Sequence, residues 1–317
     1  MSPDRLVLVL VGPTASGKTC LLDEVFGSRA GRDAFRLPEA EVISADSMQV
    51  YRGMDIGTAK PDPSLRSRLP HRLLDILEIN EQYTVGDFVH RADEACREVA
   101  ESGKLPIVSG GTGFYVRNFL CGLPAAPPAD PAIRESVARD LADKGRASLR
   151  AELASADPES AVRIHGNDVY RLTRALEITR STGRPMADFA PSRELRTGYR
   201  FLTLGLTRPA DELTARIGER VDGMIAAGLA EEVHSLRSAG HGPDEPGMKA
   251  IGYREFFELQ SGDSSTPTER IKNDTKHYAK RQMTFFRVLP GIEWISTDPK
   301  DLASRISAIV HAGISTL

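Results

Sequence analysis

Several features that define special classes of protein are missing from this chain. It has only three cysteines in 317 residues, far apart and without a Cys-x-x-Cys pair, so the sequence predicts neither a disulfide framework nor a zinc site. The apolar run at its start is six residues long, too short to span a membrane, and no signal-peptide cleavage pattern follows it. We therefore expect a reduced, cytoplasmic protein that is not exported and does not bind a membrane.

A uniform excess of positive charge is also missing. The formal net charge is −3, and charged residues (27%) and hydrophobic residues (40%) occur at ordinary levels for a globular protein. This balance argues against a uniformly basic nucleic-acid binder, although it leaves room for a local basic face. No internal repeat or low-complexity tract is present, so the length predicts one large domain or two modest ones.

The most informative pattern that is present is a phosphate-binding loop from Gly12 to Thr19. It reads Gly-Pro-Thr-Ala-Ser-Gly-Lys-Thr, which fits G-x-x-x-x-G-K-[ST]. An apolar run, Arg5–Val11, precedes it and predicts a buried parallel strand, and a predicted helix follows from Cys20 to Phe26. The glycines let backbone N–H groups surround an anion, Lys18 adds a positive charge, and the Thr19 hydroxyl can reach Mg²⁺. By itself this motif predicts a phosphate or diphosphate site, and it equally suits an ATP- or GTP-binding enzyme.

The order of apolar runs and helical patterns indicates an α/β fold, with a P-loop parallel sheet like that of the nucleotide kinases. The predicted strands are Arg5–Val11, Glu41–Ala45, Leu105–Ser109, Arg200–Leu206 and, at an edge, Ile292–Ser296. The predicted helices are Cys20–Phe26, Thr84–Ser102, one after Gly113, Pro209–Ala227, Leu229–Ala239, Gly252–Gln260 and Thr268–Leu289.

A proline-rich stretch, Gly122 to Pro131, divides the chain. It carries four prolines in ten residues, which excludes a helix or a central strand and indicates a hinge or linker. From Ala132 to Thr182 the pattern is helical throughout. We therefore expect a catalytic core of residues 1–122 and 198–317, mostly helical toward its C-terminus, and a helical insertion domain of residues 123–197.

Polar residues follow two of the predicted strands. Asp46 comes after the second strand, and ligands bind beyond the carboxyl ends of such strands, so Asp46 should face the phosphate site. Its carboxylate can act as a general base or approach Mg²⁺, but an N-cap of the next helix is an equally good interpretation. The glycine-rich stretch Ser109–Gly113 follows the third strand in the same way and is a weak signal alone.

Positive charge gathers in two regions of this acidic chain. Arg270 to Arg287 has a net charge of +5, with aromatic residues interleaved, which suits a phosphate backbone and stacked bases. Arg134 to Arg200 has a net charge of +3. Each region also fits a solvated helix face, but together they favour a nucleic-acid partner.

In combination these stretches resemble the tRNA dimethylallyltransferases, also called tRNA isopentenyltransferases, over nearly the whole chain and in the same order. The long block from Ser44 to Pro61 is the most specific. The other matching stretches are Gly12–Thr19, Pro70–Asp75, Gly110–Tyr115, Asn167–Glu177, Ile251–Glu255 and Lys280–Gln282. Eukaryotic members often carry a C-terminal zinc finger, which this chain lacks, so it is similar to the bacterial form, and we expect a monomer.

The resemblance implies transfer of a dimethylallyl group from dimethylallyl diphosphate to N6 of the adenosine immediately 3′ of the anticodon, in tRNAs that read codons beginning with U. It implies Mg²⁺ at Thr19, Asp46 as the general base, and a catalytic group completed by Lys18, Thr19 and Arg220. The implied diphosphate contacts are Gly12, Pro13, Thr14, Ala15, Ser16, Gly17, Lys18, Thr19 and Arg220. The implied contacts to the tRNA anticodon stem-loop are Asp46, Ser47, Met48, Gln49, Thr112, Arg134, Tyr170, Arg171, Leu172, Thr173, Arg174, Lys249, Ala250, Ile251, Gly252, Tyr253, Arg254, Lys280, Arg281, Gln282, Met283, Thr284, Phe285, Phe286 and Arg287.

Three alternatives remain from the residues themselves. The first is a nucleotide or small-molecule kinase, which uses the same loop and for which the insertion would be a lid. The second is an isopentenyltransferase that acts on free adenine nucleotides and would have little use for the insertion. The third is a non-catalytic RNA-binding protein, against which the joint presence of Lys18, Thr19 and Asp46 counts.

Overall fold

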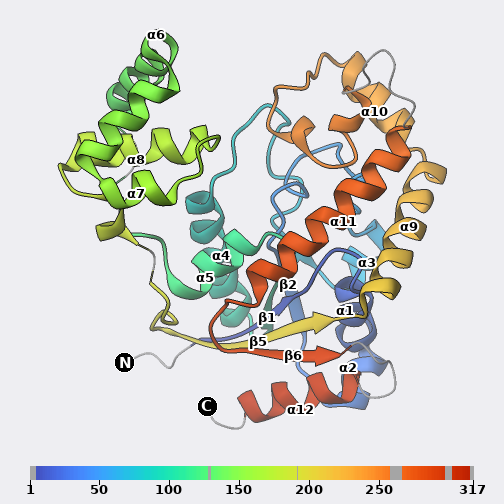
Figure 1. Cartoon of the computed structure of the whole chain (residues 1–317). Coiled ribbons are helices and arrows are strands. Elements are labelled where there is room, and N and C mark those ends of the chain that lie inside the picture. The colour runs from blue at the N-terminus through green and yellow to red at the C-terminus, as the bar shows by residue number, and fades with distance from the viewer. Residues whose placement is uncertain (1–4, 128–129, 191, 258–265, 297–301, 315–317) are drawn as a thin grey trace. The chain divides into compact units, whose positions relative to one another are not determined.

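The chain divides into two compact units, each described here by itself. The computed structural model describes residues 5–127, 130–190, 192–257, 266–296 and 302–314 (Figure 1). The first unit comprises Met1–Leu120 and Glu194–Leu317, and the second comprises Cys121–Arg193. The predicted insertion, residues 123–197, overlaps the second unit, and two residues of the predicted linker, 128–129, lie outside the described residues.

A six-stranded parallel sheet forms the centre of the first unit, which confirms the predicted α/β fold. Its order is β3-β2-β4-β1-β5-β6, so the strand before the phosphate loop is central and has β4 and β5 as neighbours. The strands are β1 (Arg5–Val11), β2 (Ala40–Ser44), β3 (His71–Arg72), β4 (Leu105–Gly110), β5 (Tyr199–Thr207) and β6 (Ile292–Ser296).

Helices cover both faces of this sheet (Figure 1). In the first unit they are α1 (Lys18–Phe26), α2 (Arg29–Phe35), α3 (Pro63–Arg68), α4 (Val85–Glu101), α5 (Gly113–Cys121, whose last residue begins the second unit), α9 (Ala210–Ala226), α10 (Leu229–Ser238), α11 (Pro267–Phe286) and α12 (Leu302–Ile314). Two short 3-10 helices, η2 (Gly247–Lys249) and η3 (Arg254–Phe256), precede α11.

Side chains along β1 point alternately to the two faces of the sheet. Leu6, Leu8 and Leu10 pack in one buried cluster with side chains of α1, α3 and α12. The intervening valines face the opposite way, where α4 packs on β1, β2 and β4. Because both faces are covered, β1 is apolar at nearly every position, as expected of a central parallel strand.

The second unit is all helical in its described residues. It contains α6 (Pro131–Ala156), α7 (Pro158–Arg163), α8 (Val169–Thr182) and the 3-10 helix η1 (Met186–Phe189). Gly145 interrupts α6 with φ 75°, and Arg180 of α8 bonds Asp140 and Glu152 on either side of that break. These ion pairs tie both halves of α6 to α8, above an apolar core that includes Leu153 and Leu176.

Most predicted elements are confirmed to within a few residues, including β6 at the sheet edge. The predicted helix Gly252–Gln260 is wrong where the chain is described: only η3 forms there, and residues 258–260 lie outside the described residues. Gly252 has φ 101°, a left-handed conformation that interrupts a helix, and its N–H donates to the buried Glu255 carboxylate. The sequence pattern also missed α2, α3, β3 and α12.

A half-buried carboxylate fixes the loop that follows β2. Glu232 of α10 accepts hydrogen bonds from the backbone N–H groups of Asp55, Ile56 and Gly57 and from the Tyr253 hydroxyl. Tyr253 is fully buried, and a Cβ added to Gly57 would lie 2.4 Å from its ring. This close approach explains why glycine stands at position 57.

We predict that Gly57→Ala lowers the free energy of unfolding by about 1–3 kcal/mol, because the added methyl group overlaps the immobile Tyr253 ring. The matched control is Gly218→Ala in α9, where a Cβ meets nothing within 4 Å and helix propensity favours alanine. Urea unfolding followed by the fluorescence of Trp294, the single tryptophan, reports on the first unit. Equal midpoints for the two variants would contradict the packing argument.

Candidate functional site

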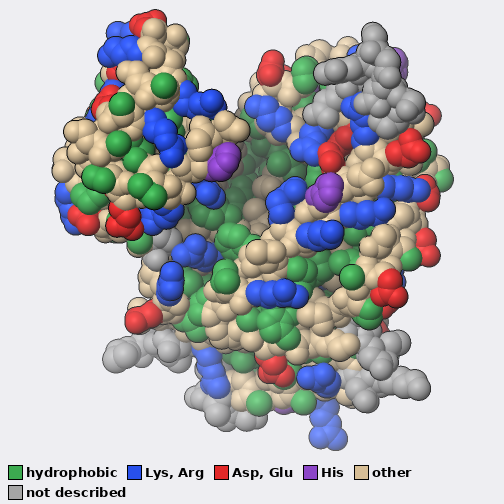
Figure 2. All heavy atoms as spheres, viewed as in Figure 1, with side chains coloured by type: hydrophobic (Ala, Val, Ile, Leu, Met, Phe, Trp, Pro, Cys, Tyr) green, Lys and Arg blue, Asp and Glu red, His purple; other side chains and the backbone are tan. Residues whose placement is uncertain are grey.

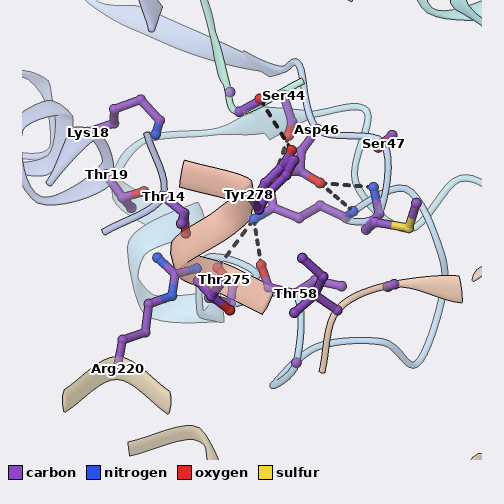
Figure 3. Close-up of a pocket in the computed structure, with 18 of the residues that line it drawn as sticks. Thr14, Lys18, Thr19, Ser44, Asp46, Ser47, Thr58, Arg220, Thr275 and Tyr278 are labelled. Atoms are coloured by element: carbon purple, nitrogen blue, oxygen red, sulfur yellow. Dashed lines mark hydrogen bonds between the residues drawn. The ribbon is translucent and has the colours of Figure 1, made fainter. Parts of the chain in front are cut away.

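A pocket of about 370 Å³ opens beyond the carboxyl ends of β1, β2 and β4, entirely within the first unit. The phosphate loop and α1 contribute Thr14, Lys18 and Thr19, and the β2 loop contributes Asp46 and Ser47 (Figure 3). Helices α9 and α11 provide further lining residues. This is the position at which parallel α/β sheets bind their ligands.

The phosphate loop is held in a strained backbone conformation by two arginines. Ala15 has φ 61° and Gly17 has φ 99°, both left-handed. Arg216 of α9 donates from Nε to the Ala15 carbonyl oxygen at 2.9 Å, and Arg208, just after β5, donates to the Ser16 carbonyl oxygen at 2.9 Å. These bonds give the outward carbonyls charged partners and stabilise the loop.

Two cations point into the pocket, Lys18 from α1 and Arg220 from α9 (Figure 3). The Lys18 ammonium group donates to the carbonyl oxygens of Gly12 (2.8 Å) and Pro13 (3.1 Å). In the described part of the chain neither cation forms an ion pair with a carboxylate. Burial lowers the pKa of both groups. For Lys18, burial and the neighbouring Arg220 together lower the pKa to about 8, against the opposing effect of Asp46. The pocket therefore has an excess of positive charge.

The expected N-cap role of Asp46 is wrong, because residues 47–50 form bends and a turn and the next helix begins only at Pro63. Its Oδ1 instead caps a local turn, accepting hydrogen bonds from the backbone N–H groups of Met48 (2.9 Å) and Gln49 (3.3 Å). The second oxygen, Oδ2, takes no part in these bonds, and the side chain lines the pocket. The cap therefore orients the carboxylate and leaves one oxygen for a ligand.

The loop after β4 connects the β2 loop to α11. Thr112 accepts a hydrogen bond from the Ser47 backbone N–H at 3.0 Å. Gln282 of α11 donates to the Gly111 carbonyl oxygen at 2.8 Å and accepts from the Thr14 backbone N–H at 2.8 Å. One buried amide therefore joins the phosphate loop, the β4 loop and α11.

Helix α11 presents different residues to the pocket and to the outer surface. Ile271, Thr275, Tyr278 and Gln282 recur at helical spacing and line the pocket. Burial and the negative charge of Asp46 raise the pKa of the Tyr278 hydroxyl, so it remains protonated at neutral pH. On the outer side Lys and Arg side chains gather along the helix (Figure 2), where Lys280 is exposed. Arg287, just after the helix, is also exposed, and Arg281 is exposed while also lining the pocket.

The structure brings together only some of the predicted site residues. Those that line the pocket are Thr14, Lys18, Thr19, Asp46, Ser47, Met48, Gln49, Arg220, Lys249, Ala250, Ile251, Arg254, Arg281 and Gln282. Tyr253 and Phe286 are fully buried, and Leu172 is in the core of the second unit. Their side chains support the surrounding surface and are not available to an RNA.

In the second unit the predicted RNA contacts differ in exposure. Tyr170 is 80% exposed and Arg171 is exposed, at the first turn of α8. Arg174 and Arg134 both lie beside the buried carboxylate of Glu177, at 3.2 and 3.7 Å. Glu177 therefore holds two of the predicted basic contacts in place.

Sequence reasoning missed several residues of the site. Arg208 and Arg216 carry no motif of their own, and their partners lie 192 and 201 residues away along the chain. The periodicity of Ile271, Thr275 and Tyr278 with Gln282 was the available signal for the pocket face of α11. His71 also lines the pocket, and its Nδ1–H donates to the Leu69 carbonyl oxygen at 2.7 Å.

The described residues contain neither a cluster of metal ligands nor a membrane-spanning helix. No group of three or more His, Cys, Asp or Glu side chains in that part of the chain is arranged to hold a metal ion. No helix there has the length and apolar character needed to cross a membrane.

Comparison with known proteins identifies the family. The family model described as IPP transferase matches residues 49–288, which is most of the chain. The chain belongs to the IPP transferase family. It is 44% identical over 312 residues to the tRNA dimethylallyltransferase of Geobacter metallireducens, covering 97% of this chain and 98% of that protein. It is 42% identical over 295 residues to the enzyme of that name from Geobacter sulfurreducens, covering 91% of each. The predicted resemblance is confirmed, and the chain is an enzyme of this transferase type.

Solved structures agree with this assignment. The tRNA isopentenylpyrophosphate transferase of Bacillus halodurans is 33% identical, with a TM-score of 0.69 over 99% of this chain and 97% of that one. A eukaryotic dimethylallyltransferase captured acting on tRNA is 26% identical, with a TM-score of 0.83 over 98% of this chain and 80% of that one. The core fold of this family therefore extends over essentially the whole chain.

We predict that pyrophosphate binding weakens more steeply with rising pH in the native protein than in Lys18→Arg. Below about pH 8 the free protein carries a protonated Lys18, and above it anion binding requires proton uptake, which reduces affinity by roughly tenfold per pH unit. Arginine stays charged throughout this range. Calorimetric titration with Mg²⁺ and pyrophosphate between pH 7 and 9 measures the difference, and parallel pH profiles would refute it.

Proposed function

We propose that this protein transfers a dimethylallyl group from dimethylallyl diphosphate to N6 of the adenosine immediately 3′ of the anticodon, in tRNAs that read codons beginning with U. The observation that carries the proposal is the pairing of two cations with one carboxylate in a single pocket. Lys18 and Arg220 suit a diphosphate, and Asp46 lines the same pocket with Oδ2 outside its capping bonds.

The reaction requires both the cations and the carboxylate. When the allylic C–O bond breaks, negative charge develops on the departing diphosphate, and the allylic carbon becomes cationic. Fixed donors in a low-dielectric site stabilise such charge most effectively. Two cations, Lys18 and Arg220, are suited to bind the leaving group. The backbone of the phosphate loop, whose carbonyl oxygens bond Arg208 and Arg216, is suited to the same role.

Asp46 supplies the complementary function of a base. The N6 amine of adenine is a weak nucleophile, and it must lose a proton as its nitrogen bonds to the allylic carbon. A carboxylate positioned by two backbone N–H groups, with its second oxygen available, can accept that proton. The target base must leave its stack to reach the pocket, as it does in other base-modifying enzymes.

We further propose Mg²⁺ as the metal cofactor, held by the Thr19 hydroxyl together with the diphosphate. Enzymes that release diphosphate commonly use a divalent metal ion, which neutralises charge on the leaving oxygens. Mg²⁺ keeps several waters and needs few protein ligands. The described residues fit this mode, because Thr19 lines the pocket and no cage of acidic side chains surrounds it.

The anticodon stem-loop is the proposed RNA partner of a monomeric enzyme. Exposed basic side chains on α11 and just after it, among them Lys280 and Arg287, suit its phosphates. The second unit offers the exposed Tyr170 and Arg171, a ring and a cation of the kind that stack on and neutralise looped RNA.

A single labelling experiment tests the reaction. The protein is incubated with radiolabelled dimethylallyl diphosphate, Mg²⁺, ATP, AMP and unmodified tRNA, and each acceptor is then separated and counted. We expect label in tRNA alone. Phosphoryl transfer from ATP without labelled tRNA would indicate a kinase, and labelled AMP would indicate an enzyme for free nucleotides.

Two substitutions separate the base from the cap at Asp46. Asp46→Asn retains an acceptor for Met48 and Gln49 but cannot take a proton, so we predict a fall in kcat of roughly 10²–10⁴-fold with tRNA affinity and stability preserved. Asp46→Ala should abolish transfer and also lower stability by about 1–3 kcal/mol through loss of the two turn hydrogen bonds. Single-turnover assays, tRNA binding and urea unfolding give the three readouts. Substantial transfer by Asp46→Asn would exclude the general-base role.

A further inference from the structure

Gln282 lies where the diphosphate site and the basic surface of α11 meet. Its side chain is 4% exposed, and both ends of its amide are engaged. The oxygen accepts from the Thr14 N–H of the phosphate loop, and the nitrogen donates to the Gly111 carbonyl oxygen, each at 2.8 Å. Although the family resemblance placed it among the expected RNA contacts, its hydrogen bonds are directed inward.

The fit around this amide is tight. A Cβ added to Gly111 would lie 2.4 Å from Gln282 Nε2, so the β4 loop approaches the helix as closely as a glycine allows. The Tyr278 hydroxyl donates to the same Gly111 carbonyl oxygen at 3.3 Å. The phosphate loop therefore holds its place against α11 through a buried polar contact that is costly to break.

The opposite side of the same helical turn is basic. Lys280, two residues before Gln282, is exposed, and Lys and Arg side chains gather along the outer side of the helix (Figure 2). Because a helix moves as a rigid element, a ligand that orders this turn of α11 also orders the phosphate loop, which is bonded to it through Gln282. A ligand on either side then reduces the conformational entropy that the other must remove.

We propose that Gln282 is a positioning residue that couples the two sites, so that RNA on α11 and a diphosphate in the phosphate loop each tighten the binding of the other. The inference rests on the proposed function and adds a regulatory link between its two substrates. Thermodynamic linkage requires the coupling to be reciprocal and equal in both directions.

The test measures the coupling ratio, which is the pyrophosphate Kd without RNA divided by the pyrophosphate Kd with RNA. Mg²⁺ and pyrophosphate are titrated into the full-length protein with and without a saturating unmodified anticodon stem-loop RNA. In the native protein we expect the RNA to lower the pyrophosphate Kd by roughly fivefold or more, and pyrophosphate to lower the RNA Kd by the same factor. In Gln282→Met, which conserves shape and removes both hydrogen bonds, the ratio should approach one.

Two further variants keep the result interpretable. If Gln282→Met does not fold, Gln282→Glu replaces it, since glutamate retains the acceptor for Thr14 but cannot donate to Gly111 at neutral pH. The ratio should again fall. Lys280→Ala is the matched control on the outer face: it should weaken RNA binding while the ratio at RNA saturation is retained.

Several outcomes would overturn the coupling. A ratio of one in the native protein would do so, and so would an unchanged ratio in the folded Gln282 variant. A loss of RNA affinity in that variant with the ratio unchanged would indicate that Gln282 contacts the RNA directly. The labelling of tRNA by the native protein is measured in parallel. Labelled tRNA with no coupling refutes this inference alone, whereas unlabelled tRNA refutes the proposed function.

Discussion

The site depends on side chains that bond the backbone of the phosphate loop from outside it. The left-handed turns at Ala15 and Gly17 give the loop its curvature, and such turns persist only where the surroundings hold them. Arg208 and Arg216 bond its carbonyl oxygens, and Gln282 bonds one of its N–H groups. Strand β5, helix α9 and helix α11 are therefore all required to shape a loop encoded near the N-terminus.

This arrangement also decides what kind of anion the loop suits. The pocket brings two cations, Lys18 and Arg220, together with the Asp46 carboxylate, whose Oδ2 stands outside its two backbone hydrogen bonds. The same three groups are what an alkyl transfer with a diphosphate leaving group requires. The family assignment and the geometry of the pocket thus support one chemistry, in which the phosphate loop receives a leaving group.

Local patterns predicted the elements and the residues whose roles are local. The apolar run of β1, Lys18 and Asp46 all belong to short motifs with a fixed geometry, and the structure places them at one site. The bond between Gln282 and Thr14 joins residues 268 positions apart, which no local pattern encodes. The wrong helix at Gly252–Gln260 has a similar cause, because tertiary contacts of Tyr253 and Glu255 override the helical propensity of that segment.

We expect the phosphate loop to bind a prenyl diphosphate and not a nucleotide. The most direct measurement is the displacement of radiolabelled dimethylallyl diphosphate from the protein by unlabelled ligands, in the presence of Mg²⁺. We predict that unlabelled dimethylallyl diphosphate displaces the label most effectively. Pyrophosphate should displace it less well because it lacks the prenyl group, and ATP should displace it least. Displacement by ATP at the concentrations at which dimethylallyl diphosphate is effective would contradict this prediction.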